Sequence, residues 1–299
     1  MAKKVISATV TPLKADGSLD RNGLKNIFER NIRHGIDGVF LFGSMGEWGS
    51  FSDSFKEEGV ELASELLKGK ADLLVGINAT SLPLSLENMK RYQKYDFDSY
   101  VFMLPGKTSS LDPVKSILTV LDAADRPVYY YHCPPNNGRD LSLEQFATIM
   151  AHPNLKGIKN SSSNMWLRRE MLIMRKERGF KTLLMEGQEW AVDEALLAGN
   201  DGMVCGMAAL TSKPMVELAR AADRGDWTEA VRLQNLLIEI YHGVYGIDIG
   251  NCWNGQKYAL MKLGLIETPY TIAQEMSSLT DEAKKRIENC LAKYRAELD

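Results

Sequence analysis

The sequence predicts an α/β protein, a closed (β/α)8 TIM barrel with a C-terminal helical extension. Apolar runs rich in β-branched and aromatic residues alternate eight times with stretches of helical periodicity in residues 1–225. Runs such as 39–42 and 128–131 are apolar throughout, which is typical of parallel strands covered by helices. A barrel of this kind commonly spans about 250 residues as one unit, and an open doubly wound sheet is the alternative.

The predicted elements follow in order along the chain. The strands are 4–10, 38–43, 72–78, 99–104, 126–132, 155–160, 181–187 and 202–207. The helices are 20–34, 53–68, 83–95, 112–124, 142–151, 164–178, 189–198 and 212–223. Three helix starts carry capping signals: Asp112 precedes a proline, and Ser142 and Ser54 are followed at capping-box spacing by Gln145 and Glu57.

The remaining residues, 226–299, contain further amphipathic segments near 226–243, 254–263 and 280–297. No linker rich in proline or glycine precedes them. We therefore interpret 1–225 as the barrel and 226–299 as helices packed on it.

Composition restricts the class of function. Hydrophobic residues make up 44% and charged residues 25%, which is the balance of a soluble globular protein. A net charge of −3 without a basic stripe argues against a nucleic-acid partner. No apolar run approaches the roughly 20 residues that span a membrane, no signal-peptide segment is seen, and the four cysteines form no C-x-x-C pair. We expect a cytoplasmic protein with a small-molecule ligand.

Lys159 is the most informative residue, because it ends a short apolar run where its amine can be buried. Desolvation disfavours the ammonium form and can bring the pKa of a lysine toward about 7 or 8, so that neutral amine attacks carbonyl groups. The alternative is an ordinary surface lysine at a strand end.

Other reactive side chains also follow predicted strands, and in a barrel these ends share one rim. Ser44 lies in a turn between Gly43 and Gly46, whose backbone N–H groups are candidates to bind a carboxylate, although such a turn can be merely structural. The turn lacks the Gly-Lys-Ser/Thr ending of a phosphate loop. Tyr131 also ends a strand, so the rim is expected to combine a hydroxyl, a phenol and an amine.

Strand alternation assigns directions to the neighbouring aromatic residues. Tyr131 and Tyr129 should point into the barrel, whereas Tyr130 and His132 should face the helices. We therefore interpret His132 as a histidine that holds the loop. The histidines show no ligand spacing, which favours a metal-free site. The aromatic residues at 48, 51 and 55 are left open between a pocket wall and core.

Several pieces of the chain resemble, in order, spacing and strand-end placement, the dihydrodipicolinate synthase and N-acetylneuraminate lyase family. They are Thr11-Pro12, Gly43-Ser44-Met45-Gly46-Glu47, Tyr131 with Pro134, Gly157-Ile158-Lys159, Gly187 and the Ala198-Gly199-x-x-Gly202 segment. The resemblance spans most of the chain.

The resemblance implies a Class I, metal-independent and cofactor-free mechanism, and a homotetramer built as a dimer of dimers. Lys159 would form a Schiff base with a 2-oxo acid such as pyruvate, and Tyr131 would shuttle the proton. Ser44 would hydrogen-bond that phenol, and backbone groups at 44–45 would hold the carboxylate. The Val204 carbonyl would face the bound acid. The substrate-binding positions so implied are Gly43, Met45, Gly46, Asn136, Ser161, Gly187 and Val204.

Three departures from the family pattern bear on the substrate. Met45 replaces a hydroxyl residue of the motif, and residues 103–107 lack the tyrosine that completes a relay across the dimer in dihydrodipicolinate synthases. Asn136 aligns with the arginine that grips the second substrate's carboxylate in those enzymes. Losing such a charge-assisted contact costs on the order of 2–4 kcal/mol in affinity, which argues against lysine biosynthesis.

The leading hypothesis is an aldolase or lyase that converts a 3-deoxy-2-oxo sugar acid to or from pyruvate and an aldehyde. The alternatives are a dehydratase that uses the same imine, a dihydrodipicolinate synthase, a weakly active 2-oxo acid binding protein, and a phosphate-binding barrel with an unrelated activity.

Overall fold

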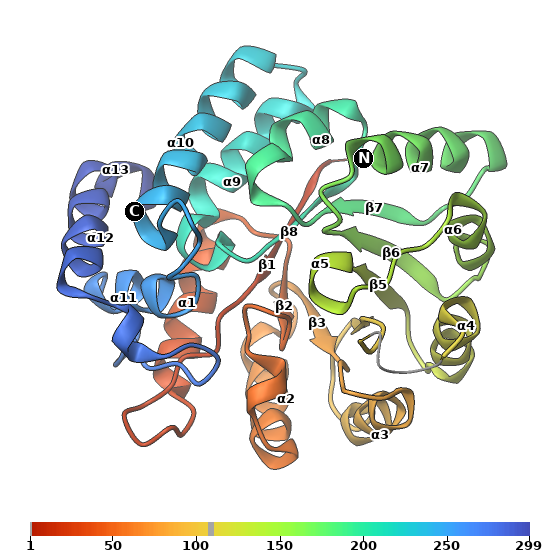
Figure 1. The fold of residues 1–299 in the computed structure, drawn as a ribbon, viewed down its shortest axis with the longest axis horizontal. Helices are drawn as coiled ribbons and strands as arrows, with labels where there is room; N and C mark the ends of the chain where they lie inside the picture. Colours follow the sequence, from red (N-terminus) through yellow and green to blue (C-terminus); the bar gives the residue numbers. More distant parts are fainter. Residues whose placement is uncertain (1, 107–110) are drawn as a thin grey trace.

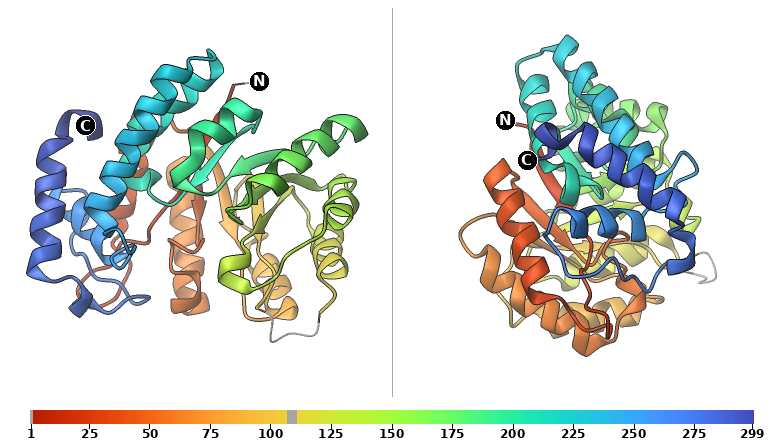
Figure 2. Two further views of the ribbon diagram at one scale, coloured as in Figure 1. Left: turned by 45° about the horizontal axis from the view of Figure 1, so that its top comes forward. Right: turned by 90° about the vertical axis from the view of Figure 1, so that its left-hand side faces the viewer.

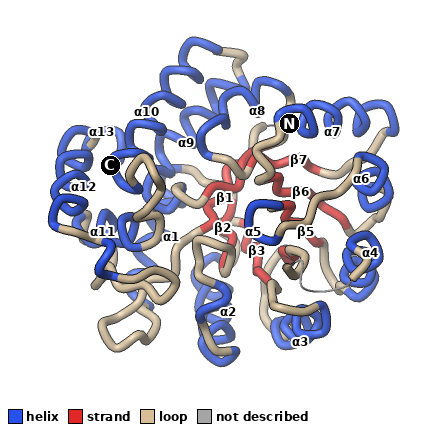
Figure 3. The backbone as a smooth tube through the Cα atoms, in the orientation of Figure 1, coloured by secondary structure: helices blue, strands red, loops and turns tan. Residues whose placement is uncertain are grey.

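The computed structural model describes residues 2–106 and 111–299, and eight parallel strands form a closed barrel at its centre (Figures 1 and 3). The strands are β1 (Lys4–Ala8), β2 (Gly38–Leu41), β3 (Asp72–Gly76), β4 (Ser99–Phe102), β5 (Val128–His132), β6 (Leu155–Asn160), β7 (Leu183–Glu186) and β8 (Gly202–Cys205). Each strand pairs with the next, and β8 pairs with β1. The predicted barrel is confirmed, and the open-sheet alternative is wrong.

Helices surround the strands on all sides (Figure 3). They are α1 (Arg21–His34), α2 (Asp53–Leu67), α3 (Leu82–Tyr92), α4 (Pro113–Ala123), α6 (Leu143–Met150), α7 (Met165–Arg178), α8 (Val192–Ala198) and α9 (Ala208–Asp223). The sequence did not predict the single turn α5 (Pro134–Asn137), nor the 3-10 turns η1 (Trp48–Ser50) and η2 (Glu189–Ala191). The segment expected as helix 189–198 thus begins as η2.

The helix caps agree with the sequence at two of three places. The Asp112 side chain accepts from Lys115 N at the start of α4, and Ser142 forms a full capping box with Gln145 at α6. At α2 the prediction was wrong, because the side chain of Ser52, not of Ser54, accepts a backbone N–H.

Alternation along the strands separates two apolar cores. Tyr129 and Tyr131 lie inside the barrel with side chains from the other strands, whereas Tyr130 packs between the barrel and the helices. This confirms the directions predicted for β5. Strand β2 ends two residues earlier than expected, because Phe42 adopts a left-handed backbone with φ of 57°.

The C-terminal helices pack on one side of the barrel, as the two views of Figure 2 show. They are α10 (Trp227–Tyr245), α11 (Asn254–Lys262), the 3-10 turn η3 (Met276–Ser278), α12 (Asp281–Lys293) and α13 (Arg295–Leu298). Helix α10 packs on α9 and α8, and α12 packs on α10 and α11. The helix predicted at 280–297 is interrupted at Tyr294.

A buried ion pair joins these helices to the barrel. Lys257 of α11 donates to Glu47, in the loop after β2, and both side chains are fully buried. The second carboxylate oxygen of Glu47 accepts from Thr271 Oγ1 and from the backbone N–H groups of Ile272 and Ala273. The C-terminal segment of the chain therefore fixes the loop that follows β2. None of the described helices is long and apolar enough to cross a membrane.

Candidate active site

Lys159 lies near the end of β6 with its side chain inside the barrel and only 5% exposed. It pairs with Tyr131 on β5 and with Met185 on β7. Burial lowers the pKa of Lys159, while the charge of Glu189 opposes that shift. The surface-lysine alternative is therefore wrong.

Tyr131 is the nearest aromatic neighbour of this amine among the recorded ring contacts, with its ring centroid 4.2 Å from Lys159 Nζ. The edge of the ring meets Phe40, 6.3 Å away between centroids. Burial raises the pKa of the phenol well above its usual range, and hydrogen bonding from Ser44 and Ser161 acts in the opposite direction. Burial thus favours the protonated phenol, and the two hydroxyl groups offset this effect only in part.

A cavity of about 320 Å³ opens above Lys159 at the carboxyl ends of the strands. The predicted site residues that line it are Ser44, Met45, Tyr131, Asn136, Lys159, Ser161 and Gly187. Gly43, Gly46 and Val204 do not line this cavity. The roles of these positions in binding stay predictions.

The two glycines of the turn after β2 are explained by close packing. A Cβ on Gly43 would lie 2.6 Å from the Phe40 ring, and one on Gly46 would lie 3.0 Å from the Phe42 backbone. The Gly46 carbonyl accepts from Thr11 Oγ1 at 2.8 Å. Val204 is likewise buried in the barrel interior. Gly43, Gly46 and Val204 therefore pack behind the residues that form the cavity surface.

Gly187, after β7, leaves room for the Lys159 side chain. A Cβ at this position would lie 2.1 Å from Ser161 Oγ and 2.9 Å from Lys159 Cε. Gly206, after β8, leaves room for the Met45 side chain in the same manner, because a Cβ at this position would lie 2.3 Å from Met45 Cγ. Both glycines are therefore needed for the shape of the cavity.

Ser44 is held at two points. Asn136 Nδ2, from α5, donates to Ser44 Oγ at 3.0 Å. Trp253 Nε1, just before α11, donates to the main-chain carbonyl of Ser44 at 3.1 Å. The residue predicted to bind substrate at 136 thus also contacts the predicted catalytic serine.

Glu189 is a residue of the cavity that the sequence did not single out. Its carboxylate accepts from the backbone N–H groups of Gly206 and Met207 at 2.6 and 3.1 Å, ahead of α9. Because it raises the pKa of Lys159, it acts on the candidate nucleophile from across the cavity. The sequence predicts Glu189 only as the first residue of a helix, because a lone carboxylate after a strand carries no stronger signal.

One wall of the cavity comes from the C-terminal helices. It consists of Tyr241, Tyr245, Ile249, Cys252 and Trp253. These residues lie far along the chain from the strand ends, in the segment that the sequence predicts only as helices packed on the barrel. No sequence signal marked them as part of the site.

His132 faces away from the cavity, as expected. It is fully buried, packs edge-on against Phe146, and lies 3.1 Å from Asp140. Burial lowers the pKa of His132 to about 4, so the ring is neutral near pH 7. Its carbonyl accepts from Ser161 N at 2.8 Å, which ties β5 to the loop after β6.

The aromatic residues after β2 belong to the core. Phe51 stacks on Phe55 at 4.2 Å, and both pack against the outer core with Trp48. None of the three lines the cavity above Lys159.

The loop after β4 contributes no tyrosine at residues 103–106, and Lys107, where the same prediction continued, lies outside the described residues. Arg139 reaches this loop and donates to the carbonyls of Pro105 and Gly106. Within 2–106 and 111–299, no three His, Cys, Asp or Glu residues are grouped to hold a metal ion.

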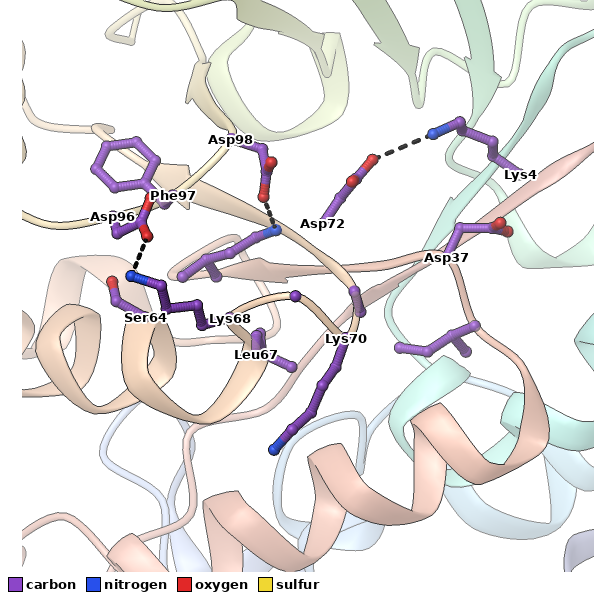
Figure 4. A pocket seen from close by; sticks show the side chains of 14 residues that line it. Lys4, Asp37, Ser64, Leu67, Lys68, Lys70, Asp72, Asp96, Phe97 and Asp98 are labelled. Carbon is purple, nitrogen blue, oxygen red and sulfur yellow. Dashed lines mark hydrogen bonds and ion pairs between the residues drawn. The ribbon is translucent and has the colours of Figure 1, made fainter.

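A second hollow, of about 470 Å³, lies at the opposite, amino end of the strands (Figure 4). Its carboxylates have partners: Asp72 pairs with Lys4, Asp96 with Lys68, and Asp98 accepts from the backbone of β3. These contacts hold the strand beginnings together, which is the structural role usual for this end of a barrel.

Comparison with known proteins gives consistent results. The model of the dihydrodipicolinate synthetase family matches residues 1–294. A 4-hydroxy-tetrahydrodipicolinate synthase of Gluconacetobacter diazotrophicus is 24% identical over 296 residues, covering 97% of this chain and 96% of that protein. An N-acetylneuraminate lyase of Escherichia coli is 28% identical over 233 residues, covering 77% of each.

Solved structures show the same fold. Dihydrodipicolinate synthase from Bacteroides thetaiotaomicron superposes with a TM-score of 0.88 at 25% identity, covering 98% of both chains. CdNal from Clostridium difficile, solved in complex with mannosamine, also gives 0.88, at 22% identity over 98% of this chain and 98% of that chain. Proteins named for two different reactions are thus similar to this chain to a comparable degree.

Proposed function

The chain belongs to the dihydrodipicolinate synthetase family, whose members are Class I pyruvate-dependent aldolases and lyases, and we propose that its substrate is a 3-deoxy-2-oxo sugar acid. The observation that carries the catalytic part is the burial of Lys159 beside Tyr131 at the base of a cavity. A desolvated amine next to a phenol supplies both the nucleophile and the acid/base that imine chemistry needs.

In this proposal the neutral Lys159 amine attacks C2 of the oxo acid and forms a carbinolamine. The Tyr131 phenol gives its proton to the hydroxyl of the carbinolamine, which leaves as water, so that a protonated imine and a Tyr131 phenolate remain. The Tyr131 phenolate takes the proton of the C4 hydroxyl, the C3–C4 bond breaks, and the aldehyde leaves. The electron pair remains as an enamine, which takes a proton at C3 from the reprotonated Tyr131. Water then hydrolyses the imine and releases pyruvate and free Lys159.

The charges around the cavity favour an aldehyde product that carries no carboxylate of its own, in addition to the carboxylate of the 2-oxo acid. Lys159 is the one lysine or arginine among the described residues that line the cavity, and Asn136 stands where the resemblance places an arginine. Glu189 adds a negative charge that would repel a second carboxylate. Amide and hydroxyl groups from Ser161, Ser163 and other lining residues suit a chain of sugar hydroxyls. These features disfavour dihydrodipicolinate synthesis.

The test is intact mass after treatment with pyruvate and borohydride, followed by product analysis with 3-deoxy-2-oxo acids. We expect one reduced pyruvyl adduct per chain, its loss in Lys159→Ala, and release of pyruvate from a sugar acid. Activity confined to dihydrodipicolinate synthesis would contradict the substrate assignment. A product that keeps all carbons but lacks one water would identify the dehydratase, and an adduct without turnover would identify a binding protein.

We also propose that the protein is a homotetramer, arranged as a dimer of dimers. Met165 and Trp166 of α7 are 59% and 67% exposed, and Ile173 of the same helix is exposed as well. Exposed apolar groups of this size commonly mark an interface. Sedimentation velocity should give a tetramer for the unaltered protein and a smaller species for Trp166→Glu. A tetramer that persists in this variant would exclude α7 from the interface.

The cellular location is part of the same proposal. The four cysteines are all free thiols, and three of them are buried. Such usage is typical of a reducing compartment, so we propose a cytoplasmic enzyme. Cell fractionation would test it.

A further inference from the structure

Ser44 is fixed between two elements that are distant in sequence. Trp253 holds its main-chain carbonyl, and Asn136 holds its side-chain oxygen at 3.0 Å. All three residues line the cavity above Lys159. The orientation of the Ser44 side chain is therefore set by its hydrogen bond with Asn136.

The donors and acceptors of the Ser44 hydroxyl determine in which direction its second hydrogen bond can run. A serine hydroxyl has one proton and two lone pairs, and the amide nitrogen of Asn136 can only donate. The contact with Asn136 thus occupies a lone pair of Ser44 Oγ and leaves its proton free. Tyr131 lines the same cavity as Ser44 and Asn136, and hydrogen bonding from Ser44 lowers the pKa of its phenol, which means that it stabilises the ionised form.

We propose that Asn136 is a positioning residue that directs the Ser44 proton toward the phenol oxygen of Tyr131. The inference rests on the proposed function, in which Tyr131 accepts a proton from the bound acid or sugar. Asn136 transfers no proton itself and acts through Ser44. The position that the resemblance assigns to carboxylate recognition therefore serves the acid/base group in this chain.

Asn136→Asp tests the direction of the bond. A carboxylate only accepts, so the Ser44 proton would turn toward residue 136 and Tyr131 would lose its donor. The readout is the rate of deuterium exchange at C3 of pyruvate, which NMR measures at a series of pH values. The exchange rate rises with pH, and we expect the midpoint of this rise to move up by about one pH unit in Asn136→Asp. Asn136→Leu, which removes the contact without adding charge, should slow exchange by about three- to tenfold.

The same substitution in a Ser44→Ala background is the matched control. In either background Asn136→Asp adds a negative charge, which by itself shifts the midpoint of the exchange profile. If Asn136 acts through Ser44, the shift in the Ser44→Ala background is smaller and contains only this effect of the charge. An equal shift in both backgrounds, or no shift in either, would overturn the inference.

Borohydride trapping separates this outcome from failure of the proposed function. A normal pyruvyl adduct in Asn136→Asp together with an unchanged exchange profile would overturn only the role of Asn136. No adduct in the unaltered protein would overturn the proposed function and this inference together.

Discussion

Tyr131 and Lys159 are direct partners in the pairing of β5 with β6, and Lys159 Nζ lies 4.2 Å from the centroid of the Tyr131 ring. Side chains of paired residues on neighbouring strands project to the same face of a sheet. The register of two strands therefore brings together an amine and a phenol that are separated along the chain.

Tyr131→Phe should separate adduct formation from turnover. The phenylalanine keeps the ring against Phe40 and Lys159 but removes the hydroxyl group that we propose moves protons. We expect the pyruvyl adduct to form still, while turnover falls by about a hundredfold or more. Steady-state rates with the best sugar acid and trapped mass measure the two effects. Native turnover in this variant would remove Tyr131 from the mechanism.

Glu189→Gln should shift the pH dependence of imine formation to lower pH. The Glu189 charge raises the pKa of Lys159, so its removal lowers that pKa and increases the fraction of neutral amine at a given pH. The glutamine oxygen can still accept from Gly206 N. The rate of borohydride trapping as a function of pH measures the shift. Glu87→Gln, on the exposed surface of α3, is the control and should leave the midpoint unchanged.

Gly187→Ala should block the amine without altering its chemistry. The added methyl group would overlap Ser161 Oγ and press on Lys159 Cε, so the lysine side chain must move. A displacement of about 1 Å can slow a reaction about a hundredfold, and we expect adduct formation to slow by this order. Gly49→Ala is the matched control, since a Cβ there meets nothing within 4 Å. Equal trapping rates in both variants would contradict the steric account.

Lys257→Met should destabilise the fold strongly, because it leaves the buried carboxylate of Glu47 without its cation. Removing one partner of a buried pair typically costs about 3–5 kcal/mol in the free energy of unfolding. Lys262→Met, on the same helix, breaks an exposed pair with Glu288 and should cost less than about 1 kcal/mol. Urea unfolding of both variants gives the comparison. Similar losses would show that the buried pair contributes no special stabilisation.

The barrel could be predicted because its signals are local. The apolar runs and helical stretches each lie within a few residues, and the caps at Asp112 and Ser142 depend on neighbours three positions away. Errors arose where the backbone departs from regular periods, as at Phe42, which ends β2 early, and at η2, where a 3-10 turn precedes α8. Such departures depend on tertiary packing, which outweighs local preference.

Strand ends that share one rim in a barrel, together with strand alternation, marked Lys159, Tyr131 and Ser44 as candidates, and the resemblance to the family supplied their expected roles. Their burial and the space that Gly187 leaves for Lys159 appear only in three dimensions.

The sequence by itself determined the barrel, the order of its elements and the rim on which a nucleophilic lysine would stand, because these follow from residue periods and short-range spacing. Only the tertiary structure decided that Glu189 lines the same cavity as Lys159, that Asn136 contacts Ser44, and that Trp253 forms part of one wall. These residues meet through loops and helices far apart along the chain, and their contacts depend on packing that no local pattern encodes.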